Sequence, residues 1–598
     1  MSGEHPHPHA HAEPTSFFRK YMWSTDHKTI GKQFLFTTLI FLFIGGLLAM
    51  LMRWNLAYPS QPVPVLGPII ADSWLFGPDG AIKPEGFNQL TTMHGTIMVF
   101  FVIIPILVGA FGNFLIPLHI GAADMAFPRL NALSYWLFWP ACAVILTSFF
   151  VSGGPAGGGW TAYPPLSDLN DGAPGTNLGM KLWLVGVFLV GWTSILGAVN
   201  YLTTIIKMRA PGMTWGRLPL VTWAQFITAT LQLLATPVIA AGAMMMLFDK
   251  MFGASLFIPE DISLGASLES AGRSGGGHPL LWQHVFWFYA HPAVYILILP
   301  SMGVASDLIS TFSRKPIFGY KAMVLSMAAI SCLGFIVWGH HMFVSGMKPM
   351  LGRTFMIATM LIALPSAIKV FNWLGTLWGG QIRFRAPMLF AIGFVSMFII
   401  GGLSGIFMAA TPVDIHIHDT YIIVAHFHYV VFGGTIFAVF GGLYFWIPKA
   451  FGRMMHEGMA KVHFWLTFIF FNATFFPMHY IGVVGHMRRI ATPTEYPWLV
   501  PIQPWNVLIS ICAFILGLSQ ILFIVNLVYS LRKGPKAAEN PWQANTLEWT
   551  LPSPVPYHNF ERIPVVYRGP HEYSTEEANG KGDWLPQSEA NGHGKGGH

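Results

Sequence analysis

The sequence predicts an all-α integral membrane protein, a bundle of twelve transmembrane helices. Hydrophobic residues make up 53% of the 598 residues and charged residues only 10%, whereas a soluble domain has about a quarter of its residues charged. Apolar runs long enough to cross a bilayer, about 20 residues as a helix, recur along the chain. The stretches between them are short and rich in glycine and proline, so no soluble domain is inserted.

Each predicted span is an apolar run bounded by polar, glycine or proline residues. In chain order the spans are 33–53, 88–118, 134–153, 181–207, 220–248, 280–304, 317–345, 352–375, 386–409, 421–448, 462–485 and 505–531. We expect one membrane domain over 33–531, with cytoplasmic tails at 1–32 and 532–598 that are polar and irregular over about 1–18 and 535–598. The first thirty residues have no apolar core segment, so the first run is expected to be an uncleaved helix.

Lysine and arginine concentrate in the N-terminal tail, in alternate loops and at the start of the C-terminal tail, whereas 154–180 and 410–420 contain none. This bias predicts that both termini face the cytoplasm. Arg488 and Arg489 lie on the opposite, positive-poor side and are therefore expected to have a dedicated role. The net charge of +7 is spread over short loops, so it indicates membrane topology and no nucleic-acid partner.

Three cysteines, Cys142, Cys332 and Cys512, lie in apolar runs, and the pattern Cys-x-x-Cys-His is absent. No c-type haem is therefore expected to be covalently attached to this chain. Buried, inert thiols are the simpler interpretation.

Histidines inside predicted spans are the first candidates for chemistry, because an intramembrane histidine is costly and usually functional. His340 and His341 are adjacent within one span, so their side chains differ by about 100° in direction and can hold one ion from two sides. His291, on the preceding span, is the natural third ligand. Three imidazoles suit copper or zinc. A hydrogen-bonded pair of core histidines is the alternative.

A second group of histidines has the spacing expected for planar cofactors. His426 and His428 are two residues apart, so they point about 200° apart around a helix and can ligate two separate cofactors with Phe427 between them. His94, on the second span, can supply the opposite axial ligand of one cofactor. A haem with two histidine ligands only transfers electrons, whereas one with a single protein ligand keeps a site for oxygen.

These histidines occur within a longer series of motifs: STDHK (24–28), GAFGN (109–113), DMAFPR (124–129), GWTAYPP (159–165) and PYH (556–558). Over nearly its whole length the chain resembles subunit I of the haem–copper oxygen reductases, specifically the A-type cytochrome c oxidases. The resemblance implies the haem–copper type of twelve-helix bundle. It also implies four-electron reduction of O₂ to water, coupled to proton uptake and proton pumping.

The resemblance assigns cofactor ligands residue by residue. His94 and His428 match the axial pair of the low-spin haem, His426 the proximal ligand of the high-spin haem, and His291, His340 and His341 the copper ligands. Tyr295, four residues after His291 and so on the same helix face, matches the tyrosine that is cross-linked to that histidine and donates an electron and a proton. Trp287 is expected to flank the copper.

Further matches concern the rest of the cofactor site. Arg53 matches the contact to the formyl group of the low-spin haem, which favours haem A there, whereas haem A or O remains open at the high-spin site. Trp160 lies in a motif of the cofactor pocket, and Arg488 and Arg489 match the propionate-binding pair, as guanidinium suits carboxylate. Anchoring of these arginines to lipid headgroups is the alternative. His418 and Asp419 match the ligands of a magnesium or manganese ion at the subunit interface.

The resemblance also implies two proton routes from the cytoplasm. Lys369, inside a span, matches the lysine channel towards Tyr295, although alone it could be a snorkelling residue. The residues that match the lysine channel are Lys369, Ser366 and Ser306, and those that match the aspartate channel are Asp124, Asn113, Asn131, Ser134 and Ser194.

At one position the chain departs from the family pattern. Most close relatives have a glutamate two residues after the first copper histidine, and here that position is Ala293. Tyr289, four residues earlier, shares the face of Ala293, and helical side chains lean towards the N-terminus. We therefore hypothesise that Tyr289 relays protons in place of the glutamate, although this chain has Ala290 where a related subset has serine. Simple core packing of the tyrosine is the alternative.

Competing functions predict different residues. A quinol oxidase would have a polar cluster where this chain has Ile44, Leu48 and Gly86, and nitric oxide reduction would not use Tyr295. A twelve-span transporter would have internal repeats, which are not visible here. We expect an oxidase in a bacterial cytoplasmic membrane, with a subunit II that carries the electron-accepting copper, a subunit III and small subunits. Its donor is expected to be cytochrome c or a membrane-bound c-type cytochrome, and its substrate O₂.

Overall fold

The computed structural model describes residues 15–170, 172–259, 276–575 and 583–590, and in these residues the fold is a bundle of long helices without a named strand. Eleven helical segments are long and apolar enough to cross a membrane. They are α1 (His27–Ala57), the segment Pro84–Ile120, α5 (Pro128–Thr147) with its extension to Phe150, α6 (Leu178–Lys207), α7 (Leu220–Phe252), α9 (Pro279–Ser313), α11 and α12 (Pro349–Met360 and Ala363–Leu377), α13 (Ala386–Ala409), the segment Tyr421–Phe451, α17 and α18 (Glu457–Phe475 and Pro477–Val483) and α19 (Gln503–Lys533) with its short lead from Val500.

The predicted span 317–345 differs from this pattern. Only α10 (Tyr320–Gly334) is α-helical there, and after a short break the chain continues as the 3₁₀ helix η6 (Trp338–Met342). Gly339 lies so close to Phe355 that a Cβ would be 2.3 Å from its ring. Glycine and β-branched residues have a low helix propensity. The α-helix therefore ends at Gly334, and the run Gly334–Gly339 adopts the backbone that this packing requires. The expectation that His340 and His341 lie on a transmembrane α-helix was wrong, since they belong to a tight turn.

Two segments that carry predicted haem ligands change their helical pitch near the histidines. The helix α3 (Pro84–Thr96) contains His94 and passes into the π-helices η2 (Ile97–Ile103) and η3 (Pro105–Gly112) before α4 (Asn113–Ile120). The helix α15 (Tyr421–His428) contains His426 and ends at His428. It passes into the π-helix η7 (Tyr429–Ile436) and then α16 (Phe437–Phe451). Such widened turns occur frequently at functional sites.

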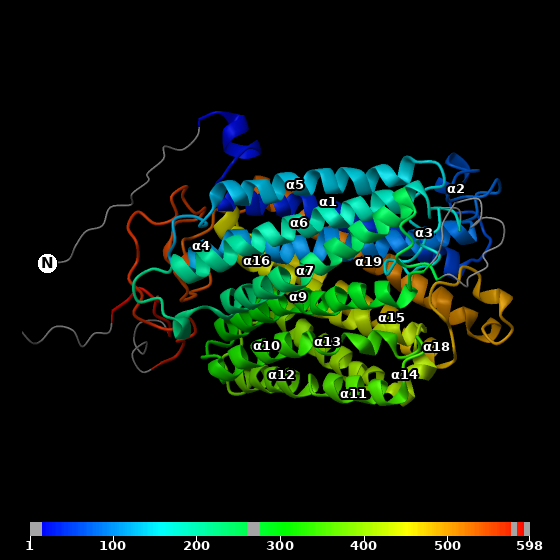
Figure 1. Cartoon of the computed structure of the whole chain (residues 1–598). Coiled ribbons are helices and arrows are strands. Elements are labelled where there is room, and N and C mark those ends of the chain that lie inside the picture. The colour runs from blue at the N-terminus through cyan, green and yellow to red at the C-terminus, as the bar shows by residue number, and fades with distance from the viewer. Residues whose placement is uncertain (1–14, 171, 260–275, 576–582, 591–598) are drawn as a thin grey trace, which may run out of the picture.

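The C-terminal segment lies at the same end of the bundle as the described start of the chain, near η1 (Phe18–Met22) (Figure 1). The described part of the tail is irregular apart from the 3₁₀ helix η10 (Leu547–Thr550), and it packs against the bundle and buries Trp542, Trp549 and Tyr573. Parts of the predicted tails, 1–14, 576–582 and 591–598, lie outside the described residues.

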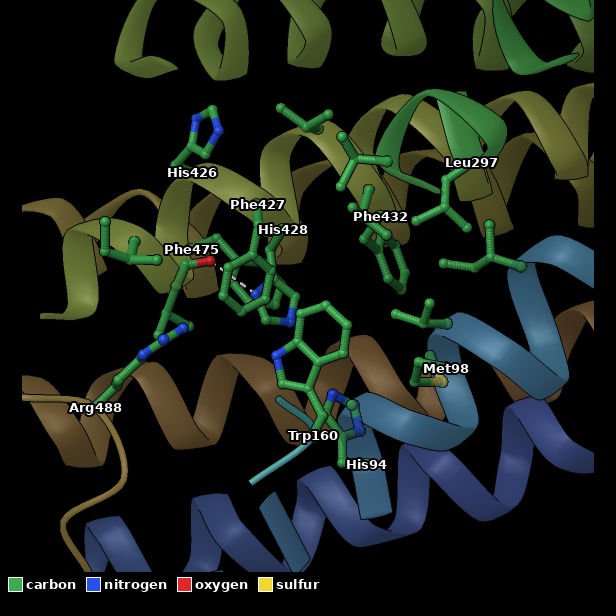
Figure 2. A pocket seen from close by; sticks show the side chains of 18 of the residues that line it. His94, Met98, Trp160, Leu297, His426, Phe427, His428, Phe432, Phe475 and Arg488 are labelled. Atoms are coloured by element: carbon green, nitrogen blue, oxygen red, sulfur yellow. Dashed lines mark hydrogen bonds between the residues drawn. The ribbon is translucent and has the colours of Figure 1, made fainter. Parts of the chain in front are cut away.

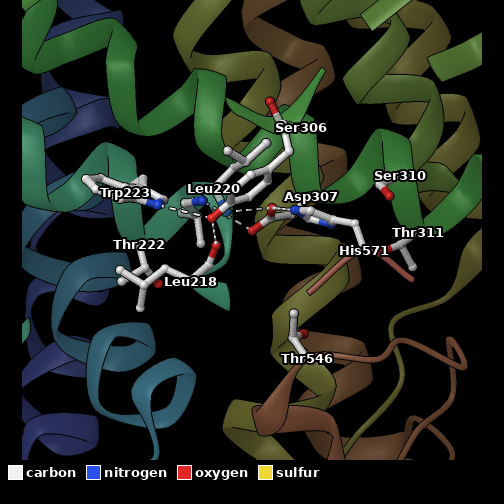
Figure 3. A network of polar contacts seen from close by, with 12 residues as sticks. Leu218, Leu220, Thr222, Trp223, Ser306, Asp307, Ser310, Thr311, Thr546 and His571 are labelled. Atoms are coloured by element: carbon white, nitrogen blue, oxygen red, sulfur yellow. Dashed lines mark hydrogen bonds and ion pairs between the residues drawn. The ribbon is translucent and has the colours of Figure 1, made fainter. Parts of the chain in front are cut away.

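An ion pair and a close polar contact hold this segment to the bundle. The side chain of Arg314, at the end of α9, is fully buried and its Nη2 lies 2.5 Å from Oδ1 of Asp583. His571 Nε2 lies 3.2 Å from Oδ1 of Asp307 (Figure 3). Asp307 in turn accepts hydrogen bonds from the backbone N–H groups of Leu220 and Val221. These groups lie at the start of α7, where a helix offers no acceptor of its own. The tail, α7 and α9 are therefore joined at one polar cluster.

Candidate functional site

A cavity of about 1150 Å³ occupies the interior of the bundle. Its lining includes all six histidines that the sequence singled out, together with Arg53, Trp160, Trp287, Tyr289, Ala293, Tyr295, Ser366, His418, Asp419, Arg488 and Arg489. A buried cavity of this size with a few convergent polar groups is the usual form of a ligand or cofactor site.

His291, His340 and His341 form a compact cluster in which one ring nitrogen of each lies within 4.8 Å of the others. His341 Nε2 lies 3.1 Å from His291 Nδ1 and 3.1 Å from His340 Nε2. In a tetrahedral site with metal–nitrogen bonds of about 2.0 Å the nitrogens are about 3.3 Å apart. The three imidazoles therefore fit one metal ion. Among the residues that the structure describes, no other group of three metal-binding side chains has this compactness.

Neighbouring side chains orient this cluster. The hydroxyl of Thr359 is 2.9 Å from His340 Nδ1, which leaves Nε2 for the metal. Trp287 stacks on His341 with ring centroids 3.8 Å apart and an interplanar angle of 13°. The indole N–H of Trp287 donates to the Tyr163 hydroxyl over 2.5 Å. Burial raises the pKa of Tyr163 to about 12, so its hydroxyl stays protonated. Thr359 and Tyr163 were not singled out from the sequence, and no spacing relative to the histidines indicates them.

Tyr295 lies beside the cluster on α9. Its hydroxyl is 2.8 Å from His291 Nε2, while the Nδ1 of the same ring faces His341. The predicted adjacency at four residues is thus confirmed. Because each nitrogen of His291 has a different partner, this ring can bind a metal and contact the tyrosine at the same time.

His94 and His428 face each other across the cavity (Figure 2). Their ring centroids are 6.5 Å apart and nearly parallel, at 15°. Nδ1 of His94 donates to Gly45 O and Nδ1 of His428 to Val424 O, each over 2.8 Å, so both Nε2 atoms remain free. One iron at about 2 Å from each nitrogen would place the centroids about 6 Å apart. The pair fits a haem with two axial histidines.

His426 points away from His428, as the two-residue spacing predicted (Figure 2). Its Nδ1 lies 2.9 Å from Gly401 O and 3.0 Å from the Ser404 hydroxyl, so Nε2 is again free for a metal. A Cβ on Gly405 would lie 3.0 Å from Cε1 of this ring. Glycine at this position therefore makes room for the imidazole, and a single histidine at this site leaves the opposite side of a bound haem open.

Cationic side chains border the pocket at two places. Arg53 on α1 donates through Nε to the Ser510 hydroxyl and through Nη2 to Asn506 O, and its buried Nη1 has no hydrogen-bond partner among the described residues. A bound group with an accepting oxygen would satisfy this donor. Trp160 lines the same pocket as His94 and His428 (Figure 2) and lies against Gly95, the residue after His94.

Arg488 and Arg489 also line the pocket, and Nε of Arg488 donates to Oδ1 of Asp419 over 2.5 Å. Burial is the largest influence and raises the pKa of Asp419, but the charges of Arg488, His418 and Arg489 and the hydrogen bond from Arg488 together hold the pKa below its ordinary value. Burial, with the like charge of Arg488, lowers the pKa of Arg489 to about 10. Both Asp419 (φ 55°) and Arg489 (φ 67°) adopt the left-handed region, a strain that clusters at functional sites.

The predicted pair His418 and Asp419 is close but not in direct contact, with 4.0 Å from Nε2 to Oδ2. His418 Nδ1 lies 3.0 Å from Oδ2 of Asp414, a residue that was not predicted, although it lies four positions earlier on a helical turn. Two ligand atoms 4.0 Å apart can be bridged by one ion with bonds of about 2.1 Å.

The residues of the predicted lysine channel lie on adjacent helices. Lys369 is fully buried on α12, with Nζ 3.5 Å from Met323 O and 5.8 Å from the ring centroid of Trp373. The indole N–H of Trp373 donates to the Ser306 hydroxyl over 2.9 Å. Ser366, one turn from Lys369, lines the cavity that contains Tyr295. Full burial is the opposite of what a snorkelling lysine would show.

The residues of the predicted aspartate channel follow a second line of buried polar groups. Asn113 Oδ1 and both polar side-chain atoms of Asn131 are buried and have no hydrogen-bond partner among the residues that the structure describes. Ser134 and Ser194 line a separate small cavity of about 30 Å³, which is large enough to hold water. Burial, with the charge of Asp26 nearby, raises the pKa of Asp124 to about 7. Unsatisfied buried polar groups and small internal cavities are the usual settings of buried water.

Tyr289 and Ala293 share the cavity-lining face of α9, as predicted. Tyr289 is only 4% exposed, stacks on Phe100 with centroids 6.3 Å apart, and its hydroxyl makes no hydrogen bond to another described residue. Since a buried tyrosine hydroxyl normally has a partner, the free hydroxyl towards the cavity is compatible with a bound water molecule.

Together, a bundle of apolar spans and a cavity with one three-histidine cluster, one facing histidine pair and one further histidine define a multi-pass membrane metalloprotein of the redox class. The family profile described as Cytochrome C and Quinol oxidase polypeptide I matches residues 29–515. The chain belongs to this family. It is the catalytic subunit of a terminal oxidase, and haem and copper are the cofactors of the family.

Several relatives are similar over almost the full chain. Cytochrome c oxidase subunit 1 of Synechocystis sp. is 48% identical over 93% of this chain and 93% of the relative, and that of Thermostichus vulcanus 45% over 96% and 95%. The alternative cytochrome c oxidase subunit 1 of Bradyrhizobium diazoefficiens is 42% identical over 96% and 94%. A cryo-EM structure of a heme-copper terminal oxidase dimer, 19% identical, shares the fold with a TM-score of 0.65 over 86% of this chain and 85% of that one.

Proposed function

We propose that this chain reduces O₂ to two water molecules, with four electrons that originate from cytochrome c and four protons from the cytoplasm. The observation that carries the proposal is the division of six histidines within one cavity into a facing pair, a single ring and a three-ring cluster beside Tyr295. The pair suits electron transfer alone, and the single ring beside a second metal suits oxygen reduction.

The residues have the following roles in this proposal. His94 and His428 hold the low-spin haem, His426 the high-spin haem, and His291, His340 and His341 the copper ion. When bound, the haem irons and copper supply the electron transfer and the binding of oxygen. Tyr295 holds a proton at its hydroxyl beside His291, and its cross-link to that ring is expected from the family.

Electrons are expected from cytochrome c, or a membrane-bound c-type cytochrome, through a copper-carrying subunit II. The alternative donor, a quinol, is disfavoured by the packing of Gly86, where a Cβ would lie 2.8 Å from the backbone oxygen of Leu75 and leave no room for histidine. The polar partners of such a site are also replaced by Ile44 and Leu48. We further propose partner subunits III and smaller ones, and both termini on the cytoplasmic side of a bacterial membrane.

The other cofactor assignments rest on residues that line the pocket. The unpartnered Nη1 of Arg53 suits the formyl oxygen of haem A at the low-spin site, and the high-spin haem is of A or O type. Arg488, Arg489 and Trp160 contact the haem propionates and ring edges. His418 and Asp419 hold a magnesium or manganese ion at the interface with subunit II.

Protons for the reaction are proposed to pass along Lys369, Ser366 and Ser306 towards Tyr295. A second route starts at Asp124 and passes Asn113, Asn131, Ser134 and Ser194, where the unsatisfied amide atoms and the small cavity can hold water. From there we propose that Tyr289 takes the place of the missing carboxylate at Ala293, so that part of the protons is pumped.

Redox-difference spectroscopy of the purified complex, with pyridine-haem analysis and copper quantitation, tests the assignment. The expected result is two haems and one copper from this chain, in addition to the copper of subunit II. His428→Ala should remove the low-spin signal, and His341→Ala should lower copper while it leaves the low-spin signal intact. A complex without a Soret band would overturn the proposal in favour of a transporter.

A further inference from the structure

Asn559, in the C-terminal segment, lies in the interior of the contact between that segment and the bundle. It is 1% exposed and has a φ of 59°, in the left-handed region. Its Nδ2 lies 2.9 Å from Ala122 O and 2.9 Å from Ala123 O. These carbonyls belong to the two residues directly before Asp124. The amide therefore contacts the loop that carries the proposed entrance of the aspartate channel.

The same amide also contacts the start of α1. Its Oδ1 accepts from Nζ of Lys28 over 2.8 Å, and its Nδ2 is 2.8 Å from His27 Nε2. His27 Nδ1 is 2.7 Å from Asn113 O. A carbonyl oxygen only accepts, so Nδ1 carries the proton of the neutral ring and Nε2 accepts from Asn559. One chain of hydrogen bonds thus joins Asn559, His27 and Asn113, a residue of the proposed channel.

Asp124 is sensitive to how tightly this region is packed. Burial is the first cause of its raised pKa of about 7, followed by the charge of Asp26, while the charge of Lys28 and the backbone N–H groups of Met125 and His27 act in the opposite direction. Lys28 Nζ lies 2.6 Å from Asp26 Oδ1. Of the charged groups that face Asp124, Lys28 is therefore held directly by Asn559, and Asp26 is held through its contact with Lys28.

We propose that Asn559 is a positioning residue for proton uptake at Asp124, and that the C-terminal segment around it forms part of the channel entrance. The proposal rests on the proposed role of Asp124 as that entrance. Asn559 acts through the loop 122–124 and through His27, and does not itself carry protons. An asparagine suits the position because its short amide both donates and accepts, and because it tolerates a positive φ.

The test uses the purified full complex in vesicles, with oxygen consumption and proton release per electron as the first readout. Asn559→Gly removes the amide while it tolerates the positive φ. We expect oxygen turnover and proton release to fall about threefold or more, with unchanged haem and copper content. The matched control is Asn540→Ala, because within the described part of the chain the Asn540 side chain hydrogen-bonds only to the backbone of Ala544 in the same segment. It should behave as the parent enzyme.

A second readout separates positioning from a general loss of structure. The infrared carboxyl band of Asp124 should titrate at least about one pH unit lower in Asn559→Gly, because a looser loop admits water. In the double variant with Asp124→Asn, turnover should be no lower than in Asp124→Asn alone. The proposal would be overturned if the double variant lost more turnover than Asp124→Asn alone. It would also be overturned if the Asp124 carboxyl band titrated at the same pH in Asn559→Gly as in the parent enzyme.

The outcomes also distinguish this proposal from the one on which it rests. If Asp124→Asn itself keeps turnover and pumping, the role of Asp124 is wrong. If Asp124→Asn is impaired and Asn559→Gly matches the parent, only the role of Asn559 is wrong. Should Asn559→Gly fail to assemble, Asn559→Asp keeps the shape and removes the donor to the two carbonyls, and it must show the same loss for the proposal to stand.

Discussion

Tyr289→Phe separates a proton relay from a packing role because the structure predicts very different effects on stability and on proton transfer. The hydroxyl makes no hydrogen bond to a described residue, and the ring stack on Phe100 at 6.3 Å is kept in phenylalanine. A near-isosteric change that breaks no protein hydrogen bond should cost less than about 1 kcal/mol of stability. A positioned proton-transfer group, by contrast, contributes about 10²–10⁴-fold in rate.

We therefore expect Tyr289→Phe to assemble with normal haem and copper content. Its proton release per electron should approach zero, and its oxygen turnover should fall at least about tenfold. Stopped-flow dye acidification of oxidase vesicles, together with oxygen consumption, measures both quantities. The matched control is Tyr429→Phe, because the Tyr429 hydroxyl donates to Asn472 Oδ1 over 2.8 Å and does not line the cavity. This control should lose about 1 kcal/mol of stability and keep its pumping.

Unchanged pumping in Tyr289→Phe would refute the relay and leave the tyrosine as a core residue. If Ala293→Glu restored pumping in Tyr289→Phe, this would support the idea that the Tyr289 hydroxyl occupies the space of the missing glutamate, because both positions line the same cavity.

Three further predictions concern the proton routes and the C-terminal segment. Lys369→Met should keep both haem spectra but slow their reduction during turnover about 10²-fold or more, and a normal rate would exclude Lys369 from the route to Tyr295. Burial raises the pKa of the Asp124 carboxyl to about 7, so this group should be protonated below pH 7 and ionise as the pH rises through that value. Infrared titration should show its carboxyl band in the parent enzyme and not in Asp124→Asn. Asp583→Asn leaves the fully buried Arg314 without its carboxylate and should cost about 1–3 kcal/mol, seen as faster proteolysis of the tail. Arg383→Gln, which removes the 43% exposed partner of the same carboxylate, should change stability by less than about 0.5 kcal/mol.

The predicted spans of the bundle came close to the structure because hydrocarbon imposes a simple length and polarity rule on every helix. The span 386–409 agrees with α13 to the residue, and most other ends differ by a few residues. The exception is 317–345, since apolar composition does not reveal that Gly339 must pack against Phe355 and that the helix therefore ends early. The length of α9 was also underestimated, because its last turns are polar and lie against the C-terminal segment.

The sequence by itself determined which histidines can act, because their spacing sets their directions: His426 and His428 must face opposite ways, and Tyr295 must lie beside His291. Only the tertiary structure decided the partners from other segments, such as Thr359 behind His340, Tyr163 behind Trp287 and Asn559 beside the Asp124 loop. The physical reason is that local periodicity governs contacts within one helix. Contacts between segments far apart in the chain depend on how whole helices and the tail pack, and no short-range pattern encodes that arrangement.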